Sequence, residues 1–300
     1  MSGWKKVLLL GLGYAAFFVA VFIPSLYFTF DPNAFGQVLQ SEAGKYQVGL
    51  ETGVISRSGL ATFKVSDFRL SLPPRHGGKA PPPFLVNHLT FKPQLRKLPG
   101  LVIAAIRGRP PPLGLDFSAT IDTGRLRGKF EAGSRDFSFA LSIGNLPLTR
   151  VTLPGVFIEE MNLSGTLAQA DIRLSSPDRD DLSQLEGKVK IEFGPFGISD
   201  FRYYGVKIGG MNFDPGGLID ADIEEGVIAL NAFQINGDLS PDIKGTIRLR
   251  KNLAQSTVNL RGKIPYSPEY RERFPNIAVY IPSPDSFVYN EPLSLLIGSP

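Results

Sequence analysis

The sequence predicts a mainly β protein, with a membrane-spanning helix at the N-terminus followed by an elongated, curved, mostly antiparallel sheet and a few short helices. Three observations predict this. The 300 residues include 22 Phe and 9 Tyr, residue types that favour strands. Apolar and polar residues alternate along many segments, as in strands with one buried and one wet face. One long uncharged run precedes these segments.

The uncharged run extends from Val7 to Phe30, with positive residues before it and Asp31 after it. At about 1.5 Å per residue, a helix of this length crosses a hydrocarbon core about 30 Å thick. Positive residues stay on the cytoplasmic side, so the chain after Asp31 is expected across the membrane. We therefore expect residues 1–30 to form a cytoplasmic N-terminus and transmembrane anchor, and residues 31–300 a β-rich domain. The expected anchor residues are Lys5, Lys6, Leu8, Leu9, Phe17, Phe18, Phe22 and Phe28.

A cleaved signal peptide is the alternative interpretation of the same run. Its apolar part would span about 7 to 15 residues and precede a small-x-small cleavage site. The run is longer than this, and no clean site of that kind follows it. The length therefore favours an uncleaved anchor.

Period-two alternation marks the expected strands along the rest of the chain. It is clear in "DFSFALSI" from Asp136, "KVKIEF" from Lys188 and "STVNLRGKI" from Ser256. In "TFKVSDFRLSL", from Thr62, the apolar phase changes after Val65, which predicts a bulge or tight turn near Ser66 and Asp67. Residues 267–274, "SPEYRERF", are expected to form a helical turn before the last strands.

Five near copies of one pentapeptide raise a separate question about the sheet. The copies are "LRGKF" from Leu126, "LSGTL" from Leu163, "LEGKV" from Leu185, "IKGTI" from Ile243 and "LRGKI" from Leu260. Each predicts a half-buried strand with no side chain at the middle of its apolar face. Either each glycine marks a bulge or bend, or the glycines lower the wall of an open apolar trough. The candidate groove glycines are Gly128, Gly165, Gly187, Gly245 and Gly262.

Residues that carry out chemistry are scarce in this chain. There is no cysteine, and the two histidines, His76 and His88, lack the spacing of a zinc site. Alternating carboxylates after Ile219 either bind calcium or form the wet face of a strand, and their spacing does not fit a calcium loop. We therefore expect no catalytic, metal or cofactor site. The net charge of +4 forms no basic patch, which argues against nucleic-acid binding.

Two parts of the chain resemble known families. "GLETGVISRSGLATFKVSDFRLSL", from Gly49, together with the single span before it, resembles the AsmA-like superfamily. The segment Ala232 to Pro275 resembles the type II secretion system protein N family. These resemblances imply a single-pass protein of the bacterial inner membrane, with the bulk of the chain in the periplasm and an AsmA-like sheet. They bring no catalytic residues.

The resulting expectation is a non-catalytic accessory component of type II protein secretion. Its partners would be the inner membrane and other secretion-system proteins, not nucleic acid. The alternative is an AsmA-like lipid-binding or lipid-transfer protein, in which an apolar groove in the sheet holds phospholipid.

Overall fold

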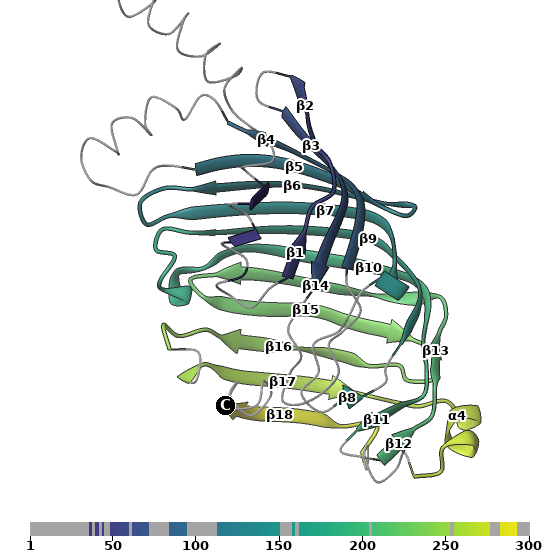
Figure 1. The fold of residues 1–300 in the computed structure, drawn as a ribbon. Helices are drawn as coiled ribbons and strands as arrows, with labels where there is room; N and C mark the ends of the chain where they lie inside the picture. Colours follow the sequence, from purple (N-terminus) through teal and green to yellow (C-terminus); the bar gives the residue numbers. More distant parts are fainter. Residues whose placement is uncertain are drawn as a thin grey trace, which may run out of the picture.

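A single large antiparallel sheet dominates the molecule (Figure 1). The computed structural model describes residues 36–37, 40–41, 44, 49–59, 62–71, 84–94, 113–150, 158–159, 162–203, 206–252, 255–276 and 283–292. Within them, 15 strands belong to the large sheet and three to a small second sheet. The predicted mainly β, antiparallel fold is confirmed.

The strands follow one another through the sheet nearly in chain order. Its first part contains β1 (Gly49–Glu51), β2 (Ile55–Gly59), β3 (Thr62–Ser71), β4 (Phe84–Pro93), β5 (Leu113–Ile121), β6 (Gly124–Ala132), β7 (Phe137–Pro147) and β9 (Leu163–Ser176). Its second part contains β10 (Glu186–Ile198), β13 (Met211–Phe213), β14 (Gly216–Glu224), β15 (Val227–Asn236), β16 (Asp242–Arg248), β17 (Thr257–Lys263) and β18 (Phe287–Pro292). The small sheet contains β8 (Ile158–Glu159), β11 (Phe201–Tyr203) and β12 (Val206–Ile208). Short helices are η2 (Leu148–Arg150), η3 (Leu182–Gln184) and α4 (Pro268–Arg273).

The large sheet is curved and twisted. Figure 1 shows β2, β3 and β4 running steeply at one end, whereas β15 to β18 lie nearly horizontally at the other. Such rotation accumulates because each strand is turned by about 20° relative to its neighbour. The path runs in chain order from β1 and β3 to β18, with the small-sheet strands β8, β11 and β12 left out of it, and β2 and β13 pair beside it with β3 and β10. The predicted elongated, curved arrangement is therefore present in the described strands.

Local turn chemistry explains the hairpin between β14 and β15. Strands β14 and β15 are joined by Glu225 and Gly226, both of which have positive φ (46° and 69°). Two such residues make the type I′ turn, whose twist matches that of the flanking strands.

Asp67 has a φ of 52° inside β3, between the segments that pair with β2 and with β1. The backbone therefore departs from regular strand geometry where a bulge or tight turn was predicted, although β3 and β4 keep the same register on both sides of Asp67.

Helix α4 is fixed to the far end of the sheet by one buried ring. Ser267 caps the helix, because its hydroxyl oxygen accepts a hydrogen bond from the backbone N–H of Tyr270 at 3.0 Å. The ring of Tyr270 is fully buried in a cluster with Met211 and Phe213, and its hydroxyl donates to the carbonyl of Gly209 at 3.2 Å. The helical turn predicted for residues 267–274 is therefore confirmed, and a neighbouring apolar cluster holds it in place.

Tyr270 gives the protein a pH-sensitive contribution to stability. Burial, with Asp238 nearby, raises the pKa of Tyr270 from 10.0 to about 12. A raised pKa means that the folded state keeps the phenol proton longer than the unfolded chain, so this contribution is complete below pH 10 and is lost towards pH 12. We expect Tyr270→Phe to reduce the loss of unfolding free energy between pH 8 and pH 11, measured by urea unfolding. Equal losses in both proteins would contradict this role.

The predicted transmembrane anchor lies outside the described residues. This applies to the whole run from Val7 to Phe30 and to every expected anchor residue. Among the residues that are described, no helix combines the length and apolar character that a membrane crossing needs. The anchor and the domain division at residue 30 remain predictions.

Candidate functional site

Strand register aligns the apolar residues of the sheet into continuous rows. Residues paired across neighbouring strands lie side by side on the same face. The first row crosses twelve strands from β3 to β18, and every member is apolar or glycine. Its members are Phe63, Phe91, Phe117, Gly128, Leu141, Ile172, Val189, Ala221, Leu230, Gly245, Leu260 and Tyr289.

A second row lies two residues along each strand, or three on β15 where the register shifts between Leu230 and Phe233, and it has the same character. Its members are Val65, Leu89, Ala119, Leu126, Ile143, Ala170, Ile191, Ile219, Phe233, Ile243, Gly262 and Phe287. A third row crosses β5 to β17 through Leu115, Phe130, Phe139, Leu174, Gly187, Ile223, Ile228, Ile247 and Val258. These three rows together form what we call the apolar face.

The apolar face is long, narrow and free of charge. With neighbouring strands about 4.8 Å apart, twelve strands extend over about 50 Å. The three rows span about 14 Å along the strands, because two residues advance about 6.8 Å. The backbone polar groups between paired strands are already hydrogen-bonded within the sheet. Within the three rows, the side chains therefore present hydrocarbon and aromatic surface.

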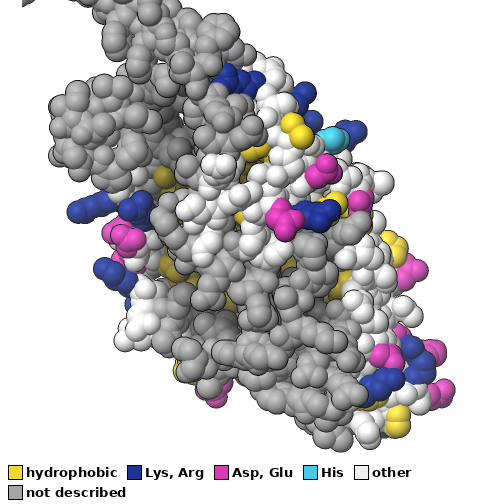
Figure 2. Space-filling view, viewed as in Figure 1, with side chains coloured by type: hydrophobic (Ala, Val, Ile, Leu, Met, Phe, Trp, Pro, Cys, Tyr) yellow, Lys and Arg dark blue, Asp and Glu magenta, His cyan; other side chains and the backbone are white. Residues whose placement is uncertain are grey.

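Most side chains of this face are only half-buried. In the first row Phe91 and Ala221 are buried, and the remaining members retain intermediate exposure. Phe91 stacks on Phe63 with ring centroids 5.1 Å apart. In Figure 2, hydrophobic side chains are visible between charged ones on this side of the molecule. Covering half-buried apolar surface of this extent with hydrocarbon is favourable, because it lowers the free energy by about 25 cal/mol per Å² removed from water.

The five predicted groove glycines all lie on sheet strands and pair with apolar residues. Gly128 pairs with Phe117 and Leu141, and Gly165 pairs with Phe196. The other three, Gly187, Gly245 and Gly262, belong to the rows defined above. The strands predicted from the pentapeptides are confirmed. Whether these glycines line a groove that holds a ligand remains a prediction.

Two kinds of close approach require glycine at these positions. A Cβ on Gly128 would lie 2.1 Å from Cζ of Phe117, so the phenyl ring occupies the space above this residue. At Gly245, where φ is 148°, a Cβ would lie 2.1 Å from the carbonyl oxygen of Asn259 on the adjacent strand. The first glycine makes room for a ring and the second for a neighbouring backbone.

The opposite face of the sheet is polar and partly neutralised by ion pairs. Lys188 lies 3.2 Å from Asp222 and 3.9 Å from Asp220. The pKa of Asp222 is lowered from its usual value, chiefly because the side chain of Asn231 donates a hydrogen bond to it at 2.7 Å. A hydrogen bond from Lys188 is the second cause. The alternating carboxylates of β14, Asp220, Asp222 and Glu224, thus lie on the wet face, beside a lysine. Among described residues, no three metal-ligating side chains cluster.

His88 is the histidine that lies in the described part of the chain. His88 is exposed on β4, where it pairs with Ser66 and Thr120. His76 lies outside the described residues.

Strand patterns identified the apolar side chains but not the rows that they form. Period two places alternate residues of one strand on one face, whereas the rows depend on how each strand is shifted against the next. The register is therefore the feature that sequence reasoning missed, and only the pairing of distant segments contains it.

No family model, curated protein or solved structure matches the chain.

Proposed function

We propose that this protein is a non-catalytic periplasmic binding protein, anchored in the bacterial inner membrane, that holds phospholipid acyl chains along its apolar face. One observation carries the proposal: the first and second rows cross twelve strands without a single charged side chain, and the hydroxyl of Tyr289 at the end of the first row is their one polar side-chain group. The anchor and the periplasmic location rest on the uncharged run from Val7 to Phe30.

The chemistry of the face favours hydrocarbon over a peptide. A peptide laid across the rows would bury its own N–H and C=O groups against side chains that, apart from the Tyr289 hydroxyl, neither donate nor accept hydrogen bonds. Each unsatisfied group costs about 1 to 3 kcal/mol. Acyl chains need no such partners, and each buried methylene contributes about 0.8 kcal/mol. The face is also about three times as long as one hydrocarbon leaflet, which is about 15 Å thick.

Photocrosslinking from the second row tests this proposal. We expect p-benzoylphenylalanine at Phe233, a half-buried position of β15, to form covalent adducts with phospholipid when cells are irradiated. The replacement keeps an aromatic ring at the position and so disturbs the sheet little. The measurement is mass spectrometry of the purified, crosslinked full-length protein.

The adjacent residue provides the matched control. Gln234 is exposed and lies on the opposite face of the same strand, where its side chain donates to Asp242 at 3.1 Å. The same photoreactive group at Gln234 should give no more than a few per cent of the adduct seen at Phe233. Equal labelling at the two positions, or none at Phe233, would rule out acyl chains on the apolar face.

A second candidate function is an accessory role in the type II secretion machine. It is supported by the resemblance of Ala232 to Pro275 and by β18, the last strand of the described sheet, on which Val288 is 71% exposed. An edge strand offers backbone groups to a strand of another protein. Crosslinking from Val288 in cells that assemble the machine should recover a named secretion component. Lys244, an exposed residue of the polar face, serves as the control. If crosslinking from Lys244 recovered the same component to the same extent, it would count against a specific contact at the edge strand.

A further inference from the structure

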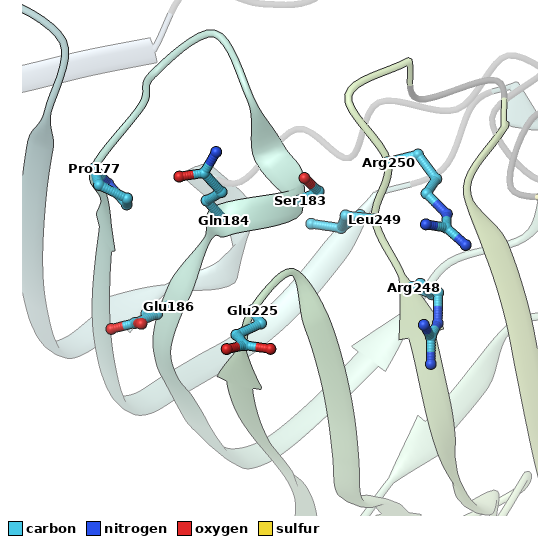
Figure 3. Close-up of a pocket in the computed structure, with 8 residues that line it drawn as sticks. All are labelled: Pro177, Ser183, Gln184, Glu186, Glu225, Arg248, Leu249 and Arg250. Atoms are coloured by element: carbon cyan, nitrogen blue, oxygen red, sulfur yellow. The ribbon is translucent and has the colours of Figure 1, made fainter.

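A pocket of about 470 Å³ opens where the ends of four strands meet (Figure 3). Glu186 begins β10, Glu225 lies in the turn between β14 and β15, and Arg248 and Arg250 end β16 and follow it. Figure 3 shows the two glutamates on one side and the two arginines on the other. The volume falls within the usual range for small-molecule sites, about 300 to 1,000 Å³.

The loops that form this pocket are held by backbone hydrogen bonds. The N–H of Gly226 donates to the carbonyl of Leu185, and the N–H of Leu249 donates to the carbonyl of Gly226, each at 2.8 Å. The N–H of Arg250 donates to the hydroxyl of the fully buried Ser256 at 3.0 Å. These hydrogen bonds fix the loops that carry the two glutamates and the two arginines, which we call the two charged walls of the pocket. Fixed loops lower the entropic cost of ordering the walls around a ligand.

The four charges do not neutralise one another. Among described residues, none of the four side chains lies within 4.0 Å of an opposite charge, although each sign is present twice. All four side chains are exposed and therefore accessible to a solute. Two separated walls of opposite sign match a molecule that carries both a negative and a positive group.

The pocket adjoins the apolar face through Leu249. This residue lines the pocket and is also buried in a cluster with Leu185 and Ile223. Packed against that cluster are Ile228 and Ile247, which belong to the third row. A ligand whose polar end lies between the charged walls therefore has apolar surface next to it.

We infer that this pocket binds a phosphate-and-ammonium zwitterion, with the phosphate on Arg248 and Arg250 and the ammonium on Glu186 and Glu225. Guanidinium groups donate paired hydrogen bonds to phosphate, and carboxylates accept from ammonium. The shared chemistry is that of phosphoethanolamine, whether free or as a phospholipid headgroup. The identification of the headgroup rests on the proposed function, whereas the zwitterion site itself does not.

Soluble O-phosphoethanolamine tests the site without involving the apolar face. We expect the full-length protein to bind it, as measured by calorimetric titration at low salt. Glu225→Gln should weaken binding of O-phosphoethanolamine about three- to fivefold, the magnitude of one exposed ion pair. The same variant should strengthen binding of inorganic phosphate, because it removes a repelling charge. Arg248→Gln should weaken both.

Matched controls keep this test specific. Glu224→Gln and Arg261→Gln change exposed side chains of the same types on β14 and β17, outside the pocket, and should leave both affinities unchanged. The inference is overturned if O-phosphoethanolamine does not bind, or if the pocket variants and the control variants behave alike. Weakening of both solutes by Glu225→Gln would also overturn the two-wall assignment.

A lipid arm separates the headgroup from the free solute. With the photoreactive group at Phe233, phosphatidylethanolamine should be captured about three- to fivefold more than phosphatidylglycerol, and Glu225→Gln should remove the preference. Capture of both lipids without preference would leave the proposed function standing and refute the headgroup assignment. Capture of neither, with O-phosphoethanolamine still bound, would refute the proposed function and restrict the site to free zwitterions.

Discussion

Replacing Gly245 with alanine is expected to lower the free energy of unfolding by about 2 to 3 kcal/mol. Gly245 has a φ of 148°, and a Cβ built on it would lie 2.1 Å from the carbonyl oxygen of Asn259. That oxygen belongs to the backbone of β17, so relief requires the two strands to move apart. The hydrogen bonds between β16 and β17 would be strained as a result.

Gly144 offers the matched control within the same sheet. It lies in β7, and a Cβ at this position would meet nothing within 4 Å. Gly144→Ala should therefore leave stability unchanged or raise it by about 0.5 kcal/mol, because alanine restricts the unfolded chain more than glycine does. Urea unfolding of the two full-length variants, followed by circular dichroism, makes the comparison. Equal midpoints would show that β16 and β17 do not approach as closely as described.

The second large effect is expected at Leu260, where aspartate should weaken lipid binding about ten- to hundredfold. Leu260 is half-buried in the first row, between Gly245 and Tyr289. Losing its contact with an acyl chain removes about 1.5 to 3 kcal/mol, and the charge would also have to be desolvated. Titration with a fluorescent phosphatidylethanolamine measures the change in dissociation constant.

Asn259 allows the same charge to be introduced one residue away. It is exposed on the polar face of β17, so Asn259→Asp should change the lipid affinity less than twofold. Far-ultraviolet circular dichroism establishes that both variants keep the sheet. Leu260→Ser, which adds no charge, should fall between the two. Comparable affinities for Leu260→Asp and Asn259→Asp would exclude acyl chains from this part of the face.

Local signals were sufficient to predict most strands. Alternation in "KVKIEF" predicts β10, because side chains of a strand point alternately to its two faces. The helical turn predicted for residues 267–274 is found as α4. What these signals omit is the partner of each strand, so β7 pairing with β9 past the small-sheet strand β8 had to come from the structure.

The pocket shows the same limit for the candidate site. Glu186, Glu225 and Arg248 are unremarkable in the sequence, where each belongs to an ordinary polar position at a strand end. They meet because three hairpins turn at the same end of their strands, and hydrogen bonds from Gly226 and Leu249 hold these loops together. A binding site assembled from turns separated by tens of residues has no local pattern.

The sequence by itself determined which residues of each strand are apolar, and therefore that one side of a sheet would repel water. This holds because side-chain direction has a period of two and depends only on neighbouring residues. The tertiary structure alone decided that these residues form rows and that charges of opposite sign face each other across a pocket. Register is a non-local property, and a shift of one residue in any pair would have moved its apolar side chains to the wet face.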